Sequence, residues 1–413
     1  MRLLQPLRHR SVALLWSGLA LSAIGDQLYA VALSWIAVGV LGAGAGYLTA
    51  LQSGCILFSV LSAGFWLDRW DSRRVLVADY LVEATALALV VMAWTQTGSA
   101  SPTLLVLAVI VLSIGIGITR PAVQAILPEL LPDHAQLPAA NALIDSTERI
   151  ARLAGPLIVG ALAGLLPEQH FLTLDALSFV AAAGAAMLLP PAVVRPIAPR
   201  ARARDIVLRG ITALRADTLL RDCWRVTSIA NGTWMVTFFL CVPLAIQRAG
   251  VTGPGGSGLG AFGLVIACYG MTNFAALLVV GNRKPSPQPA GQIIAARAVM
   301  TAGMAIVTLT AWIAPPDLML PGFMLGALVA APSGPMGDVP IAVMRQTRVG
   351  PDEIVSVVRA FIANNQVGSI VGLLVAPALI HALGIAGVVG LCSLLTAGVG
   401  VFMFLRSPRY AIA

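Results

Sequence analysis

The chain has 413 residues, of which 58% are hydrophobic and only 11% charged, and its mean hydropathy is +0.89. A soluble globular domain is about 45–50% apolar and about 25% charged, so this composition excludes an ordinary soluble domain and favours a polytopic membrane protein. The net charge of +8 does not indicate nucleic-acid binding, because the basic residues recur in short segments between apolar runs and form no single patch.

Hydropathy predicts an all-α membrane protein with twelve transmembrane helices. Helices are expected because an open structure in lipid must satisfy its backbone internally, and the alternation typical of barrel strands is absent. The first run is too long for a signal-peptide core and is predicted to be a retained helix. The predicted spans are 12–40, 45–67, 75–96, 102–127, 139–166, 171–189, 223–247, 257–281, 291–314, 318–344, 355–382 and 384–406.

Arginines and lysines concentrate in every second connection between the predicted spans. The positive-inside rule therefore places these connections and both termini in the cytoplasm, and we expect a multi-pass protein of a bacterial inner membrane. The longest connection, 190–221, is rich in Arg and Pro and predicts a cytoplasmic linker lying on anionic headgroups. It divides the chain into two predicted six-helix bundles, 1–189 and 222–413. The Pro-Asp pairs at 132–133 and 351–352 are a weak sign of repeated halves.

No enzyme motif is present in the sequence. The four histidines are scattered, and there is no HExxH, G-x-S-x-G or Walker sequence, so we predict neither an enzyme nor an ATP-driven pump. The five cysteines lie in or beside apolar runs without a CxxC pair and are interpreted as small buried hydrophobes. We expect no cofactor and no resident metal.

The segment 64–74, GFWLDRWDSRR, gathers charges in the short loop between the second and third spans. Gly64 permits close helix approach, and Asp68 can face a helix N-terminus. Arg73 and Arg74 hold the loop inside, and they can pair with carboxylates such as Asp79 or Asp145. A simple positive-inside clamp accounts for the arginines but not for the spacing of the whole set.

This loop resembles the signature G-x-x-x-D-R-x-x-x-R-R of the major facilitator superfamily. SAIGDQLYAVALSW (22–35), AANALIDSTERIARLAGPLIVG (139–160) and LDALSFVAAA (174–183) resemble its drug-efflux branch, related to macrolide-efflux and siderophore-export proteins. The resemblance implies alternating access between two six-helix bundles. It also implies that the loop is a gating latch formed by Gly64, Asp68, Arg69, Arg73, Arg74, Asp79 and Asp145, with Asp68 and Arg69 at its core.

The segment ARLAGPLIVG (151–160) resembles the antiporter motif of the same family. Gly155, Pro156 and Gly160 match, whereas Ala151 and Val159 replace two of its glycines. The resemblance implies export in exchange for protons. Plain helix packing by small residues is an alternative interpretation.

Ionisable residues inside predicted spans are functional candidates because their burial in lipid is costly. Asp26 lies near the middle of the first span and is the strongest candidate for proton or substrate coupling. Glu83 and Asp338 are further candidates. Arg120 is included because the resemblance links an arginine of the fourth span to proton coupling. Arg297, near the start of its span, is expected to reach the interface by snorkelling.

Uncharged polar residues inside the spans are candidates for lining a substrate cavity. They are Gln52, Gln124, Asn141, Asn231, Asn364 and Asn365.

These patterns predict a secondary transporter that exports a small organic molecule, a drug or a siderophore-like metabolite, with proton coupling. Alternatives are export of a divalent metal ion, lipid flipping, uniport without protons, or a scaffold without transport. The expected partners are the substrate, protons and membrane lipids, without nucleic acid, and the expected state is a monomer.

Overall fold

A computed structural model describes residues 2–62, 71–133, 136–191, 203–283, 286, 288–350 and 353–410. The described residues are 90% helical and include no strand, which confirms the predicted fold class. Nine helical segments among them are long and apolar enough to cross a membrane. These segments are Arg10–Ser59, Ser72–Thr97, Pro102–Leu130, Gln169–Met187, Thr218–Ala249, Gly258–Gly281, Pro289–Ile313, Pro316–Arg348 and Ile354–Tyr410. The number of twelve crossings stays a prediction.

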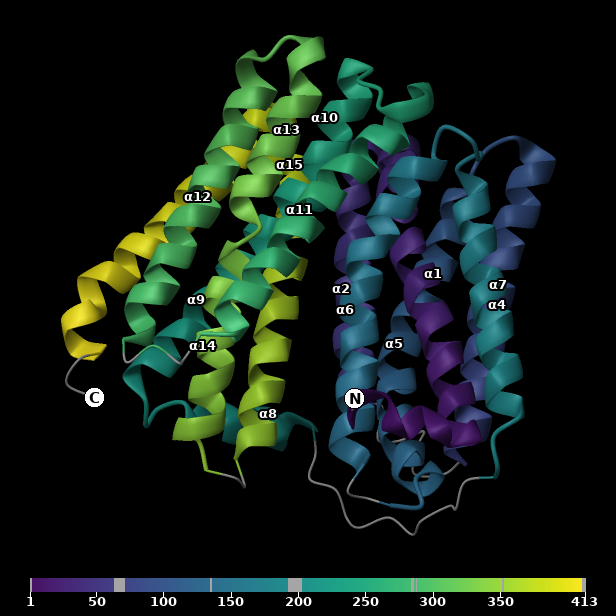
Figure 1. Ribbon diagram of the computed structural model, residues 1–413. Coiled ribbons are helices and arrows are strands. Elements are labelled where there is room, and N and C mark those ends of the chain that lie inside the picture. The colour runs from purple at the N-terminus through teal and green to yellow at the C-terminus, as the bar shows by residue number, and fades with distance from the viewer. Residues whose placement is uncertain are drawn as a thin grey trace. The chain divides into compact units, whose positions relative to one another are not determined.

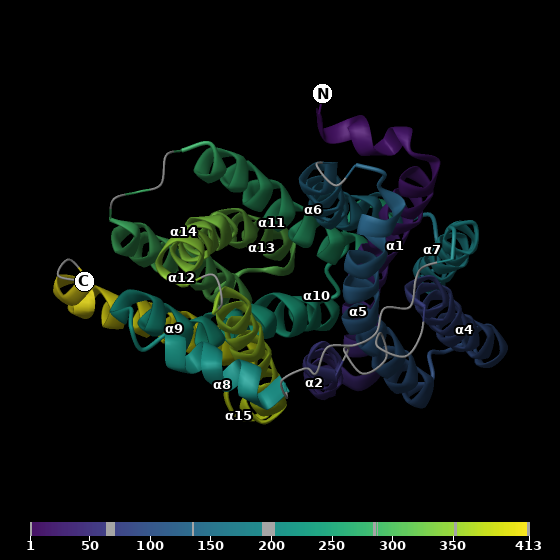
Figure 2. The same cartoon turned by 90° about the horizontal axis from the view of Figure 1, so that it is seen from below.

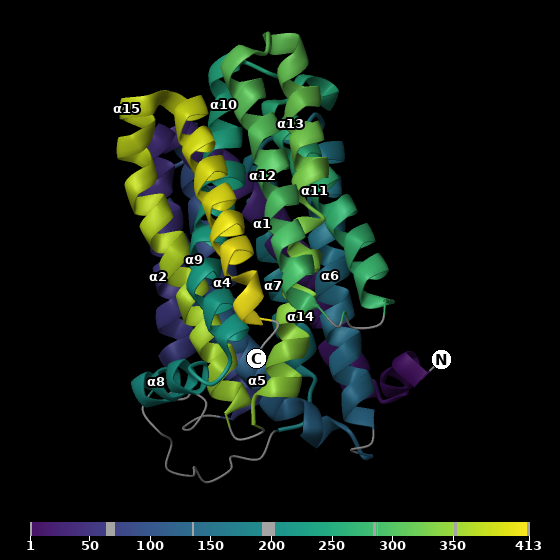
Figure 3. The ribbon, with the colours of Figure 1, turned by 90° about the vertical axis from the view of Figure 1, so that its left-hand side faces the viewer.

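Two of these segments are too long for a single crossing. They contain 50 and 57 residues, or about 75 and 85 Å of helix, against a hydrocarbon core of about 30 Å. The first turns at Gly42–Gly44, where Gly42 has φ +56°, and the second turns at Gly384, with φ +70°. Glycine adopts positive φ without a steric penalty. Figure 3 shows the two arms of α15 (Ile354–Tyr410) joined at this turn.

The chain divides into two compact units, and one of the boundaries between them falls inside α2 (Ala45–Ser62). Unit 1 is Met1–Val40 with Cys55–Arg200. Its helices run alongside one another, and α4 packs along both α5 and α7 (Figures 1 and 2). These helices are α1 (Arg10–Leu41, except for its last residue), α4 (Ser72–Thr97), α5 (Pro102–Leu130), α6 (Leu137–Leu162) and α7 (Gln169–Met187), preceded by the short η1 (Arg2–Arg8).

Unit 2 is Leu41–Gly54 with Ala201–Ala413. Within the predicted linker 190–221 the structure describes one helix, and the next helix begins at Thr218. The helices are α8 (Ala203–Ala213), α9 (Thr218–Met235), the π-helical η4 (Val236–Cys241), α10 (Val242–Ala249), α11 (Gly258–Gly281), α12 (Pro289–Ile313), α13 (Pro316–Ala330), α14 (Ser333–Arg348) and α15.

A hydrophobic core at one end of unit 2 joins α9, α12, α14 and α15. Leu220, Val357 and Met403 are fully buried in it. Further along, α9 and α15 approach so closely that a Cβ on Gly232 would lie 2.5 Å from the carbonyl oxygen of Gly368. Small residues at such positions permit backbone contact between helices.

The predicted span 318–344 is interrupted between α13 and α14. Pro332 immediately precedes α14 and has no N–H to donate, so the regular hydrogen-bond ladder stops there. The side-chain amide of Asn273 on α11 donates to the carbonyl of Ala331 over 3.0 Å. At this break, a carbonyl outside the regular helical hydrogen-bond pattern is therefore bound by a side chain of α11.

A buried carboxylate ties the beginning of α9 to the end of α15. Asp222 has no exposed surface. It lies 2.9 Å from Arg406 and 3.4 Å from Arg225, and it accepts a hydrogen bond of 3.1 Å from the Tyr410 hydroxyl. Asp222 and its partner Tyr410 are 188 positions apart in the sequence, so this carboxylate joins two distant segments of the chain.

Candidate functional site

Asp26 lies on α1 where two other helices of unit 1 come close to that helix. On one side, the α-carbon of Gly25 faces Asp175 and Ser178 of α7, and a Cβ at Gly25 would collide with both side chains. On another side, Gln27 packs against Gly155 of α6, where a Cβ would collide as well. Glycine on each side permits this spacing, and Asp26 lies between the two contacts.

Two more carboxylates belong to α4 and face α5. Glu83 and Asp79 both lie against Gly115, with the Asp79 Oδ1 3.1 Å from the position of a Cβ there. The Thr119 hydroxyl donates to the Asp79 Oδ2 over 2.6 Å. Only 4% of Glu83 is exposed.

These helices bring four acidic residues into one group, the carboxylate cluster of Asp26, Asp79, Glu83 and Asp175. Asp26 interacts electrostatically with each of the other three, and Glu83 with Asp79 and Asp175. Asp175 is completely buried, and its Oδ2 has no hydrogen-bond partner among the residues that the structure describes. The ion pairs found between described residues all lie outside this cluster.

Two tyrosines complete the surroundings of the carboxylate cluster. Tyr29 on α1 and Tyr80 on α4 are at most 5% exposed. Both interact electrostatically with Asp26 and Glu83, and within the described part of the chain neither hydroxyl has a hydrogen-bond partner. A phenol can donate to a carboxylate or accept from a protonated one. The sequence had singled out neither tyrosine.

An ion-pair chain links α5 and α6 beside the cluster. Arg120 pairs with Glu148, and Arg152 approaches the same carboxylate at 3.7 Å. Glu148 in turn interacts electrostatically with Asp26. Arg120, a coupling candidate, therefore contacts the group around Asp26 through Glu148.

The predicted latch is described only in part. Gly64, Asp68 and Arg69 lie outside the described residues. Arg73 donates from its guanidinium to the carbonyl of Met187 at the end of α7, and its backbone N–H donates to Asp71, which caps α4.

The remaining latch residues lie apart from this contact. Arg74 and Asp145 are exposed, and neither takes part in an ion pair found between described residues. Asp79, assigned to the latch by resemblance, lies in the carboxylate cluster.

The antiporter-like residues all lie in α6 and are buried. Gly155 contacts Gln27 directly, and Pro156 and Gly160 follow on the same helix. The motif thus packs against the residue next to Asp26, an association that the sequence alone did not reveal.

In unit 2, the arginine expected to snorkel is buried instead, with 8% of Arg297 exposed. Its Nη2 would lie 3.2 Å from a Cβ on Gly337. The neighbouring Asp338 is exposed on α14 and interacts electrostatically with Arg297 and Arg345. The coupling candidate of this unit therefore faces two cations.

Among the cavity candidates, the asparagines of α9 and α15 join those two helices. Asn231 donates to the carbonyl of Asn365 and, over 2.7 Å, to Ser369, and Asn364 donates to the carbonyl of Trp224. The Oδ1 of Asn365 is buried without a partner among the described residues. Gln124 and Asn141 are exposed, and Gln52 is partly exposed.

A metal site is not found in the described ranges, because no group of three or more His, Cys, Asp or Glu side chains there is arranged to hold a metal ion.

The fold is similar to that of solved transporter structures. One of them is the POT family transporter PepTSo, with TM-score 0.73, 10% identity and coverage of 98% of this chain and 99% of that one. Another is a point mutant of the nucleoside transporter NupG, with TM-score 0.70, 14% identity and coverage of 96% of this chain and 99% of that one.

The chain belongs to the Major Facilitator Superfamily, whose sequence model matches residues 15–363. It is 29% identical over 259 residues to y4rN of Sinorhizobium fredii (strain NBRC 101917 / NGR234), an uncharacterized MFS-type transporter. That match covers 62% of this chain and spans about three fifths of the relative's length, 60%. The expectation of a secondary transporter is supported by both the fold and the family.

Proposed function

We propose that this chain exports a small organic molecule in exchange for protons, by alternating access. The observation that carries the proposal is the carboxylate cluster of Asp26, Asp79, Glu83 and Asp175 in unit 1. Glu83 and Asp175 are buried, and Asp26 and Asp79 are partly buried. Neighbouring carboxylates repel one another when ionised, so such a group binds protons as a coupled set and takes up or releases them as its surroundings change. This is the property that a proton-coupled transporter requires.

In this proposal Asp26 is the residue at which coupling takes place. It lies between α6 and α7, so movement of either helix changes the spacing of carboxylates around it. Arg120 acts from α5 through Glu148. The cluster would be protonated when it faces the more acidic side of the membrane and deprotonated when it faces the other.

The direction of transport is inferred from α6. The antiporter-like segment packs on α1 at Gln27, beside Asp26, through the close contact at Gly155. A motif linked to exchange in related proteins is therefore adjacent to the proposed proton-binding residue. We infer export from the cytoplasm, with both termini cytoplasmic, and a drug or siderophore-like metabolite as cargo.

Proteoliposomes that contain the purified chain and a trapped pH dye test the proposal. A panel of hydrophobic drugs, a siderophore and Fe(II) is applied to the wild type and to Asp26→Asn. Proton movement that depends on one of these compounds and disappears in the variant supports exchange and identifies the cargo class. Asp317→Asn, an exposed aspartate at the start of α13, is the matched control and should transport normally.

Transport that continues in Asp26→Asn without proton movement in either protein would contradict the proposal and indicate a uniporter. The same assay on Asp175→Asn and Glu83→Gln measures whether the cluster acts as a unit. Coupled groups give non-additive losses, so the double variant should be little worse than the more severe single variant.

A further inference from the structure

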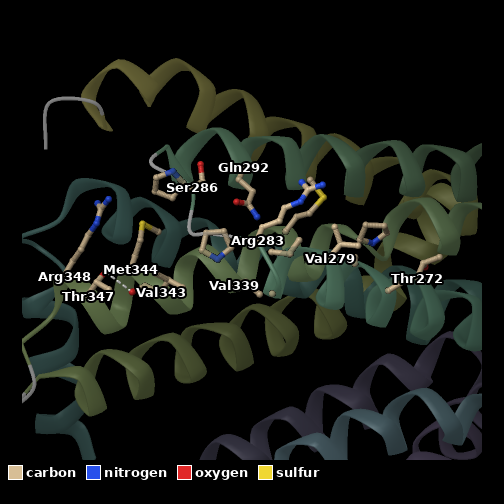
Figure 4. A pocket seen from close by; sticks show the side chains of 18 residues that line it. Thr272, Val279, Arg283, Ser286, Gln292, Val339, Val343, Met344, Thr347 and Arg348 are labelled. Carbon is tan, nitrogen blue, oxygen red and sulfur yellow. Dashed lines mark hydrogen bonds between the residues drawn. The ribbon is translucent and has the colours of Figure 1, made fainter. Parts of the chain in front are cut away.

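Unit 2 contains a surface pocket between α11, α12 and α14, with a volume of about 1040 Å³. Figure 4 shows the labelled side chains in a row, from Thr272 and Val279 at one end to Met344, Thr347 and Arg348 at the other. The volume is at the upper end of the range of about 300–1,000 Å³ found for small-molecule sites. The carboxylate cluster belongs to unit 1 and contributes no residue to this pocket.

The lining of the pocket combines apolar and polar side chains. Its apolar part includes Val279 of α11 with Met336 and Val339 of α14. Its polar part includes Arg283 in the middle of the row, close to Val339, and Arg348 at the far end (Figure 4). The pocket therefore offers hydrocarbon contact with hydrogen-bond donors beside it.

The length of the pocket matches one leaflet of a membrane. From Met336 to Arg348 the helix α14 advances by about 18 Å, and from Thr272 to its last residue, Gly281, the helix α11 advances by about 14 Å. Half of a hydrocarbon core is about 15 Å thick. The end of the pocket at Thr347 and Arg348 lies where the positive-inside rule places the cytoplasmic surface.

The two arginines of the pocket differ in how their charges are balanced. Arg348 is paired with Asp217, at 2.9 Å. Arg283 is exposed, and no carboxylate among the described residues lies within 4.0 Å of it. A guanidinium group without a carboxylate beside it attracts an anion, and the arginine fork suits phosphate oxygens.

We propose that this pocket binds one anionic phospholipid of the cytoplasmic leaflet, with its phosphate at Arg283 and an acyl chain along Val279 and Val339. One observation supports both the phosphate contact and the acyl-chain contact. An apolar wall about as long as one leaflet lies beside an arginine that has no carboxylate partner among the described residues. This site shares no residue with the carboxylate cluster, so the proposal does not depend on proton coupling.

Native mass spectrometry of the purified full chain, titrated with phosphatidylglycerol and with phosphatidylcholine of the same chains, tests this site. We expect one phosphatidylglycerol to bind with about tenfold higher affinity than phosphatidylcholine, the size of one charge-assisted contact. Arg283→Ala should remove most of that preference. Arg215→Ala, an exposed arginine of unit 2 outside the pocket, should keep it.

A second pair of variants tests the apolar part without changing charge. Val279→Trp fills the wall of the pocket, whereas Val401→Trp places the same bulk on α15, and both valines are exposed in the wild type, at 51% and 57%. We expect the first to lower phosphatidylglycerol affinity severalfold and the second to leave it unchanged. An excess of inorganic phosphate should not displace the lipid, because phosphate lacks the acyl chain.

Equal lipid binding by wild type, Arg283→Ala and Val279→Trp would overturn the proposal. Displacement by inorganic phosphate would overturn it as well, and would indicate a site for the free anion. Displacement by a compound that the protein transports would assign the pocket to cargo instead of lipid. Failure of proton coupling in the Asp26→Asn assay would leave these outcomes unaffected.

Discussion

Gly155→Ala tests whether the contact between α1 and α6 positions Asp26. The added Cβ would lie 3.3 and 3.4 Å from the carbonyl carbon and Cα of Gln27 and closer than 3.0 Å to its Cβ. Ordinary carbon contacts are about 3.5–4.0 Å. The two helices must therefore separate locally by on the order of 1 Å. A gap of this size removes about a quarter to a half of the van der Waals energy of each neighbouring contact between α1 and α6.

Overpacking of this kind costs about 1–3 kcal/mol, which should lower the apparent Tm by on the order of 5 °C. The separation should also widen the spacing around Asp26, so we expect proton movement per transported molecule to fall. Both quantities are measured on purified protein, by thermal unfolding and by the dye assay in proteoliposomes.

Gly184→Ala is the matched control, because Gly184 is also a helical glycine of unit 1 but a Cβ there would meet nothing within 4 Å. Alanine is the better helix former by about 0.5–1 kcal/mol, so this variant should be as stable as the wild type or slightly more so. Similar Tm and similar proton coupling in the two variants would refute the reasoning about Gly155.

Three further outcomes are expected. Asn273→Leu removes the side-chain donor to the carbonyl of Ala331, which keeps only the 3.3 Å bond from the Gly334 N–H, so thermal unfolding should show a loss of about 0.5–1.5 kcal/mol, and an unchanged Tm would contradict the bridging role. Gly368→Leu forces α9 from α15 and should abolish recovery of folded protein by gel filtration, whereas a monodisperse product of normal Tm would speak against the close approach. Burial raises the pKa of Glu168 in the loop before α7, an effect that the 2.6 Å hydrogen bond from Trp35 opposes. Folding therefore favours the protonated form of Glu168. The Tm of the wild type relative to that of Glu168→Gln should fall as pH rises from about 4 through the pKa of Glu168 in the folded protein. A rise in this difference with pH would refute the direction of the pKa shift.

Helix positions followed closely from hydropathy, because a lipid environment requires long uninterrupted apolar segments. α1, Arg10–Leu41, agrees with the prediction of 12–40, and α11, Gly258–Gly281, agrees with 257–281. The break at Pro332 was missed, although the sequence APSGP at 331–335 contains the Pro and Gly residues that signal it.

The carboxylate cluster was predicted only in part, because hydropathy does not specify which helices are neighbours. Asp26 and Glu83 were identified from their depth alone. Asp175 was not, since its closeness to Asp26 arises from the packing of α7 on α1. The small residues Gly18 and Gly25, seven positions apart on α1, could have indicated that face.

The burial of Arg297 shows a second reason why side-chain environment was not predictable. Its depth in the span suggested a side chain that reaches the interface. Instead it shares the buried face of α12 with Ile293, Ala296 and Met300, at the spacing of successive helical turns. Depth along a helix and rotation about its axis are independent, and only the first can be counted from one end.

The compensation of Asp222 has a consequence for biosynthesis. While the chain is being made, Asp222 is inserted long before Arg406 and Tyr410 leave the ribosome, and only Arg225 of its described partners is then present. An incompletely compensated buried carboxylate costs about 3–5 kcal/mol. Unit 2 therefore cannot reach its full stability until its last helix is in place. A chain truncated before Arg406 would unfold locally around Asp222 more often, and membrane quality-control proteases act on such locally unfolded chains.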